Sequence, residues 1–219
     1  MGVTLVTIDR YEGETEDILK KIAEAGEEPT KKEKKVMTDE EAESIARMLM
    51  FSEFCAHLHG LLSKESFKKL IDMGYCNAAA STKYHGSCPG GLFNHSVGVA
   101  GNLCDLSIKM QLKWERTESP LIIGLFHDLC KIDQYIKNDD GSYSWNKEVP
   151  EGHGSKSVEY IEKFTNIKLT DEERACILHH MGAFGDRVEQ EAYSKAVKEY
   201  PNVLWTHTAD MITSQIEGV

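Results

Sequence analysis

From residue 38 onward, apolar side chains recur along the chain every three to four residues, the spacing of an amphipathic α-helix. The first such stretch opens with Thr38 and Glu41 in the order of a capping box, which marks the start of a helix. A second stretch begins near Ser63. Further helical patterns follow over residues 91–112, 120–130, 154–165, 170–181, 189–199 and 202–217.

One stretch breaks this spacing. Around the sequence "NDDGS", residues 138–142, apolar and polar positions alternate, and Asp-Gly is typical of a hairpin turn. The chain shows no internal repeat and no low-complexity tract. The pattern as a whole predicts an all-α fold, a helical bundle with one small β-hairpin excursion.

The beginning of the chain differs from the rest. The run "GEEPTKKEKKVMTDEE" is highly charged and contains a proline, which indicates a linker. We therefore divide the chain into an N-terminal appendage with a charged linker, residues 1–37, and a helical domain, residues 38–219. The first residues lack the basic start of a signal peptide, and no apolar run reaches the ~18 residues of a membrane span, so no membrane association is expected.

Composition narrows the class of protein. The 219 residues are 41% hydrophobic, enough for a substantial core, and the net charge of -11 corresponds to a pI of about 5.3. An acidic surface repels phosphate backbones, so no long nucleic acid is expected as a partner. Six scattered cysteines without a CxxC pair indicate reduced thiols and a cytoplasmic protein. The oligomeric state stays open.

The strongest chemical signal is the stretch "LIIGLFHDLCK", residues 121–131, in which an apolar segment ends in an imidazole and a carboxylate. Charged groups are rarely buried unless they are paired or bind a metal. Several of the other histidines also fall near the ends of predicted helices, and helices of a bundle can direct such groups into one cavity. The candidates are His95, His127, Asp128, His153, His179, His180, His207 and Asp210.

The side-chain types in this set favour a divalent cation. Imidazole and carboxylate suit Fe, Mn, Zn, Co or Ni, and a carboxylate-rich site also takes Mg. No cysteine belongs to the predicted set, which disfavours a closed structural zinc site. A centre with open positions holds water and lowers its pKa until hydroxide is available near neutral pH. We expect one or two such ions, of open identity.

These residues resemble the HD superfamily of metal-dependent phosphohydrolases, whose pattern is a histidine, an adjacent His-Asp pair and a distant aspartate. The pattern reads here as His95 in "GGLFNHSV", His127 and Asp128 in "GLFHDLCK", and Asp210 in "WTHTADMI". The resemblance extends over residues 75–216. It implies that the helical domain is an HD-domain bundle in which these four residues hold a first metal.

Two further segments are similar to the branch of the superfamily that binds two metals. The segment "GHGSKSVEYI" supplies His153, and "ERACILHHMG" supplies His179 and His180. The position of His180 before "MG" makes it the better match to a ligand. The resemblance implies that Asp128 bridges to a second metal, which His153 and His180 also hold.

The segment "AAASTKYHGSCPGGLFNHS", residues 78–96, is similar to the beginning of the HD domain in phage-type HD proteins and in bacterial 3'–5' exoribonucleases. Those exonucleases carry a separate OB domain that binds nucleic acid. The first 38 residues are too short for an OB fold, and the acidic charge opposes a long substrate. The resemblance therefore supports the catalytic domain and not the exonuclease activity.

The function expected from this resemblance is hydrolysis of a phosphate ester of a nucleotide or another small phosphorylated metabolite by metal-activated water. Whether the ester is a monoester or a diester stays open. Lys131 is expected to offset phosphate charge, and His179 or His85 to protonate the leaving oxygen. The alternatives are an HD-type di-iron oxygenase and a metal-binding regulatory module without turnover.

The remaining histidines receive other roles. His207 lies three residues before Asp210 on the same helix face, where it either orients that carboxylate or packs. We assign His57 and His59 to the surface or to packing.

Overall fold

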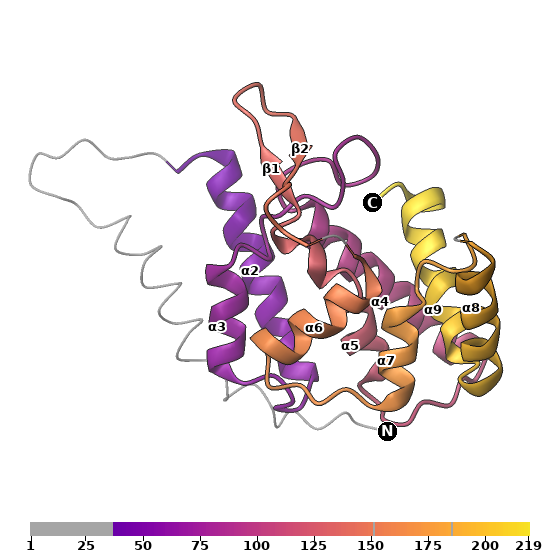
Figure 1. Ribbon diagram of the computed structural model, residues 1–219. Helices are drawn as coiled ribbons and strands as arrows, with labels where there is room; N and C mark the ends of the chain where they lie inside the picture. Colours follow the sequence, from indigo (N-terminus) through magenta and orange to yellow (C-terminus); the bar gives the residue numbers. More distant parts are fainter. Residues whose placement is uncertain (1–36, 151, 185) are drawn as a thin grey trace, which may run out of the picture.

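Figure 1 shows the computed structural model, which describes residues 37–150, 152–184 and 186–219. Within these ranges the chain forms eight α-helices and one two-stranded hairpin, which confirms the all-α fold with a small β-hairpin. The predicted appendage, apart from its last residue, lies outside the described residues. The helices are α2 (Asp39–His57), α3 (Lys64–Asp72), α4 (Gly91–Lys109), α5 (Ser119–Phe126), α6 (Gly154–Phe164), α7 (Asp171–Leu178), α8 (Arg187–Glu199) and α9 (Asn202–Met211).

The hairpin lies where the alternating pattern predicts it. Strands β1 (Tyr135–Lys137) and β2 (Tyr143–Trp145) pair antiparallel, with Tyr135 opposite Trp145. In Figure 1 the hairpin projects from one end of the bundle, while α4 and α5 run through the middle. Helices α2 and α3 lie on one side of that central pair, and α8 and α9 on the other.

The helix starts follow the local signals in the sequence. The hydroxyl of Thr38 accepts from the backbone N–H of Glu41, and the Glu41 carboxylate accepts from the backbone N–H of Thr38, which confirms the capping box. Ser63 caps α3 in the predicted place. Helix α8 begins before the predicted residue 189, because Asp186 and Glu189 form a further capping box there.

The ends of three predicted helices differ from the regular α-helix that the pattern indicates. Helix α4 stops at Lys109, before the predicted 112, and Gln111 just beyond it has a φ of 53°, outside the helical region. Helix α5 stops at Phe126, and the chain re-forms as a 3₁₀ turn over Leu129–Ile132. The last helix, α9, continues past Met211 as a wider π-type turn over Ile212–Glu217.

An aromatic cluster anchors the core on the side of α2. The ring of Phe51 contacts the rings of Phe67, Tyr75, Phe93 and Phe126, with centroids 5.1–6.3 Å apart. Aromatic rings at these separations add to the burial of apolar surface. The cluster ties α2 and α3 to the central pair of helices. In the described part of the chain, none of the helices has the length and apolar character needed to cross a bilayer.

Two glycines allow the close helix contacts on which the site depends. A β-carbon on Gly124 of α5 would lie 2.3 Å from the α-carbon of Ala100 on α4. A β-carbon on Gly154, the first residue of α6, would lie 2.4 Å from the carbonyl oxygen of Leu178 at the end of α7. Only glycine fits either position without moving backbone. The first contact sets α4 against α5, and the second sets α6 against α7.

Candidate metal centre

Asp128 lies at the middle of the predicted ligand set, directly after α5. Its carboxylate oxygen Oδ2 lies 3.7 Å from His95 Nε2 and 3.5 Å from His127 Nε2. His95 projects from α4, and its Nε2 also lies 3.2 Å from Asp210 Oδ1 on α9. The structure therefore brings together all four residues that the resemblance assigns to a first metal.

The second carboxylate oxygen of Asp128 faces the residues that the resemblance assigns to a second metal. Oδ1 lies 3.5 Å from His180 Nε2 and 4.0 Å from His153 Nδ1. His180 lies two residues beyond the end of α7, and His153 precedes the first residue of α6. Asp128 thus stands between two groups of ligands, one at each of its oxygens.

Backbone carbonyls orient three of the imidazoles. Nδ1 of His127 lies 3.0 Å from the carbonyl oxygen of Gly124, and Nδ1 of His180 lies 2.7 Å from that of Ile177. Nδ1 of His95 lies 2.9 Å from the backbone oxygen of Val219. These backbone oxygens only accept, so each Nδ1 donates a proton to its partner, and this fixes the ring with Nε2 directed toward Asp128. Ligand histidines in metal sites are held in this way.

Unsatisfied polar atoms show that the group fits a cation. Among the described residues, Asp128 Oδ1 and His180 Nε2 are buried side-chain atoms without a hydrogen-bond partner. The Nε2 atoms of His95 and His127 also face each other at 3.3 Å. Buried acceptors without a donor cost free energy. A divalent cation between these atoms would accept their lone pairs and offset the two carboxylate charges, so the donor set fits such an ion.

Both carboxylates are ionised in the folded protein. Burial acts to raise the pKa of Asp128, but Lys131 and His127 beside it hold that pKa well below its ordinary value. Burial opposes ionisation of Asp210 too, yet the imidazole of His95 lowers its pKa to about 2. The site therefore offers two negative charges on side chains that are largely buried.

The imidazoles differ in how readily they lose a proton. Burial lowers the pKa of His127 and of His153, which favours the neutral rings that bind metals. Burial acts in the same direction on His180, but the carboxylate of Asp128 outweighs it and raises the pKa. Of these three rings, His180 is therefore the one at which a proton competes best with a cation.

A cavity of ≈ 830 Å³ opens onto the centre. Its walls include Asp128, His153 and Asp210 of the ligand set, together with Lys131 and His85. The Lys131 ammonium lies 2.7 Å from Asp128 Oδ2, and this carboxylate raises the pKa of Lys131 although burial acts to lower it. The cavity thus combines a group that could hold a cation with a positive charge on its wall.

Aromatic and sulfur-containing side chains complete the cavity wall. Tyr84 and Phe184 line it while remaining 80% and 73% exposed, so they stand at its open side. Tyr135 and Met181 also line it. A cavity with both apolar and charged walls suits a small molecule that carries an apolar or aromatic portion beside an anionic group.

The remaining predicted histidines are placed as follows. His179 is half-buried and does not belong to the residues that line the cavity, whereas His85 does. His207 forms a hydrogen bond with the backbone of His180, in which its Nδ1 lies 2.8 Å from the His180 carbonyl oxygen. His57 and His59 are exposed on the surface, as expected.

One residue of the site was missed by the sequence analysis. The thiol sulfur of Cys130 lies 4.0 Å from His153 Nδ1, and the two atoms form a compact group with the carboxylate of Asp128. The predicted set contained no cysteine, whereas the structure brings Cys130 beside two of its members. The closeness of Cys130 to Asp128 in the sequence, two residues apart, was a possible signal. It did not show that the Cys130 side chain lies beside His153, because that depends on the 3₁₀ turn.

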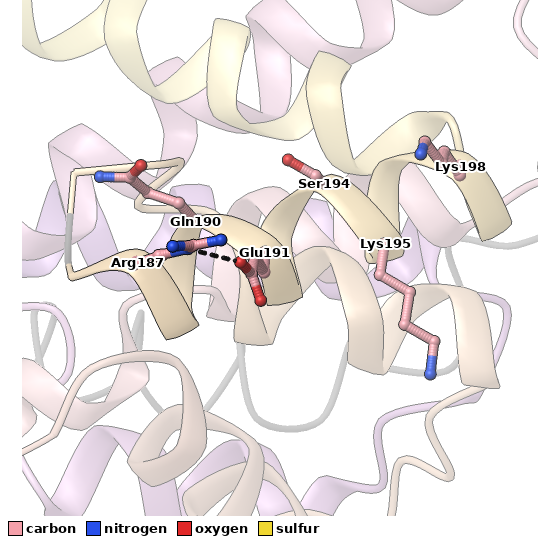
Figure 2. A pocket seen from close by; sticks show the side chains of 6 residues that line it. All are labelled: Arg187, Gln190, Glu191, Ser194, Lys195 and Lys198. Carbon is pink, nitrogen blue, oxygen red and sulfur yellow. Dashed lines mark hydrogen bonds and ion pairs between the residues drawn. The ribbon is translucent and has the colours of Figure 1, made fainter.

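A second hollow lies on the exposed surface of α8, away from the ligand set. Figure 2 shows the six residues that line it, all from α8, with Arg187 paired to Glu191 at 2.8 Å. These side chains are solvent-exposed and spaced along one helix face, as in an ordinary charged surface. Of these two hollows in the described part of the chain, the cavity over Asp128 is therefore the stronger candidate for a functional site.

Comparison with protein-family models, with curated proteins and with solved structures finds no match for this chain. The case for its function therefore rests on its own residues and their geometry.

Proposed function

We propose that this protein is a metal-dependent phosphohydrolase of the HD type, which cleaves a phosphate ester of a nucleotide or another small phosphorylated metabolite. The observation that carries this proposal is the position of Asp128. Each of its carboxylate oxygens faces a separate group of imidazoles, and within the part of the chain that the structure describes Oδ1 has no hydrogen-bond partner. A carboxylate with this surrounding suits a bridge between two cations.

The chain's residues divide between the two cations. One would be held by His95, His127, Asp128 and Asp210, and the other by Asp128, His153 and His180. When bound, such ions supply a hydroxide nucleophile at neutral pH and offset charge on the phosphoryl oxygens. We leave the metal open among Fe, Mn, Ni, Co, Zn and Mg.

Two residues of the cavity wall act on the substrate in this proposal. Lys131 carries a positive charge on the wall and binds a phosphoryl oxygen that approaches Asp128. Of the two candidates for proton transfer to the leaving oxygen, His85 lines the cavity and His179 does not. We therefore assign that step to His85.

The proposal extends to the cellular compartment in which the protein acts. The six cysteines are free thiols, and five of them are at least partly buried. Free thiols of this number are typical of a reducing compartment. We propose that the protein acts in the cytoplasm on a soluble, small phosphorylated substrate.

The test combines metal analysis with turnover. The protein is purified without added metal, its metal content is measured, and release of phosphate is followed on a panel of nucleoside mono- and polyphosphates and p-nitrophenyl esters. Asp128→Ala should lose both metal and turnover, because it removes a ligand common to both halves of the site. His57→Ala, at an exposed histidine outside the cavity, serves as the control and should match the wild type.

Other results would favour other functions. Full metal content and full rate in Asp128→Ala would refute the assignment of this residue. Oxygen consumption by the iron-loaded protein, with oxidation of a carbon substrate and no phosphate release, would favour the di-iron oxygenase. Tight metal binding without turnover on any substrate would favour the regulatory module.

A further inference from the structure

Cys130 occupies a position in the site that the proposed phosphohydrolase function does not use. The residue is fully buried, and its sulfur lies 4.0 Å from His153 Nδ1. Ligand atoms of Asp128, Cys130 and His153 all lie within 4.8 Å of one another. The three side chains therefore point toward one common space.

The local backbone fixes this arrangement. Cys130 lies in the 3₁₀ turn that follows Asp128, and its backbone N–H donates to Ser157 Oγ at 3.2 Å. Ser157 is on α6, one helical turn beyond His153, and the backbone N–H of Ser157 donates to the His153 carbonyl at 2.9 Å. The turn that carries the thiol is thus attached to the helix that carries the imidazole.

A second observation points to a ligand at this place. Asp128 is 2% exposed, its Oδ1 has no hydrogen-bond partner among the described residues, and this oxygen lies 4.0 Å from His153 Nδ1. The His153 nitrogen therefore has the thiol sulfur and an unsatisfied carboxylate oxygen at the same distance. Around a tetrahedral zinc ion, sulfur and nitrogen ligands lie about 3.6 Å apart, close to the separations seen here.

We infer that Cys130 is a thiolate ligand of the second cation, which gives the two halves of the centre different metal preferences. This inference rests on the proposed metal centre. The first group offers only imidazole and carboxylate, whereas the second combines a carboxylate, two imidazoles and a sulfur. Thiolate ligands select zinc and other thiophilic cations over magnesium or manganese. The thiol proton passes to solvent as the sulfur–metal bond forms.

The test is X-ray absorption at the zinc edge of the full chain, stripped of metal and reloaded with zinc. We expect a sulfur neighbour at about 2.3 Å beside nitrogen and oxygen at about 2.0–2.1 Å. With cobalt in place of zinc, the same sulfur should give a near-ultraviolet sulfur-to-cobalt charge-transfer band. Cys130→Ser should lose both signals, and its zinc affinity at the second position should fall by more than about tenfold, while its manganese affinity changes little.

Cys55→Ser is the matched control, because Cys55 is equally buried but lies on α2, outside the ligand group. It should keep the sulfur signal. Bound zinc with only nitrogen and oxygen neighbours in the wild type would overturn the inference and leave the phosphohydrolase proposal standing. Because this spectrum is recorded on the wild type, it tests the inference even if Cys130→Ser does not fold. Failure of the wild type to bind any metal would instead refute the metal centre, and the inference with it.

Discussion

Gly124 lies so close to Ala100 that a β-carbon on it would be 2.3–2.6 Å from the backbone nitrogen, α-carbon and β-carbon of that alanine. The contact joins α5 to α4 near the middle of the bundle. His127 follows Gly124 by three residues, and its Nδ1 hydrogen-bonds to the Gly124 carbonyl oxygen. The spacing between these two helices therefore decides how near His127 lies to His95.

Gly124→Ala tests this dependence. The added methyl group must push α5 away from α4, because backbone atoms occupy its place. We expect the free energy of unfolding to fall by about 1–3 kcal/mol, as for other overpacked cores, and the metal content of the folded fraction to fall with it. Urea unfolding and elemental analysis measure the two effects.

Gly101→Ala is the control for this substitution. Gly101 lies on the same helix as Ala100, and nothing lies within 4 Å of its hypothetical β-carbon. Alanine there should stabilise the helix by about 0.5–1 kcal/mol and leave metal binding unchanged. If both variants bind metal like the wild type, helix spacing does not set the geometry of the first group.

Gly154→Ala applies the same test to the second group. A β-carbon at this position would overlap the carbonyl oxygens of Leu178 and Ile177. The Ile177 carbonyl also orients His180 through its Nδ1. We expect the variant to separate His153 from His180 and to lose the cation assigned to the second group while keeping the one assigned to the first. A metal titration that shows the same stoichiometry for variant and wild type would contradict this expectation.

Much of this organisation could be predicted from the sequence, because it depends on local rules. The capping box at Thr38 and Glu41 and the Asp-Gly turn of the hairpin each involve a few neighbouring residues. His127 and Asp128 stood out because a His-Asp pair after an apolar segment is chemically unusual, whereas His95 and Asp210 were assigned to the first group through the resemblance, and the structure brings all four together. The preference for His180 over His179 as a ligand stays a prediction; in the structure His180 is buried and His179 is half-buried.

Features that depend on distances between elements could not be predicted. Periodicity predicts which face of a helix is buried. It does not predict that Gly124 and Gly154 lie so close to the backbone of a neighbouring helix that no β-carbon would fit. The carbonyl partners of the imidazoles are backbone atoms, which every residue carries, so no sequence signal marks them. Cys130 was not included in the predicted set, because only the 3₁₀ turn after α5 brings its sulfur beside His153.

A buried ion pair supports the scaffold outside the metal centre. Glu173 is fully buried and accepts from the Arg116 guanidinium at 2.7 and 2.5 Å and from the Ser119 hydroxyl at 2.8 Å. Arg116→Ala would leave this carboxylate without its counter-charge, so we expect a loss of about 3–5 kcal/mol in the free energy of unfolding. Metal content per folded molecule should not change, because the pair lies outside the ligand group.

Arg174→Ala is the matched control for that experiment. Arg174 pairs with Glu162, and both side chains are more than one-third exposed. Exposed pairs contribute about 0–1 kcal/mol, so chemical denaturation should barely distinguish this variant from the wild type. Equal losses in the two arginine variants would show that the burial of Glu173 has no special cost.

Thiol reactivity should separate the cysteines by burial. Burial raises the pKa of the Cys76, Cys130 and Cys176 thiols to about 12, whereas Cys88 is exposed. The thiolate is the reactive form, and at pH 8 a thiol with such a pKa is almost wholly protonated. We expect a maleimide to label Cys88 first in the native, metal-free protein, with the three buried thiols reacting only after unfolding. Rapid native labelling of Cys176, read by peptide mass spectrometry, would contradict this.

Lys131 gives a prediction in which two measurements move in opposite directions. Its ammonium lies 2.7 Å from Asp128 Oδ2, the oxygen that also faces His95 and His127. A cation bound there must share this oxygen with the lysine charge. Lys131→Gln removes the charge and keeps a polar side chain of similar reach, so calorimetry should show tighter metal binding than in the wild type.

Turnover of the same variant should fall. In the proposed function Lys131 binds a phosphoryl oxygen, and loss of one such stabilising donor typically lowers kcat by about 10²–10³. Tighter metal binding with lower kcat would separate this role from a structural one, since a merely misfolded site loses both. Lys83→Gln is the control, because Lys83 is exposed and lies between the cavity-lining residues Ser81 and Tyr84 without lining the cavity itself. It should leave metal affinity and kcat unchanged. Weaker metal binding in Lys131→Gln would show that the lysine holds Asp128 in place and does not compete with the ion.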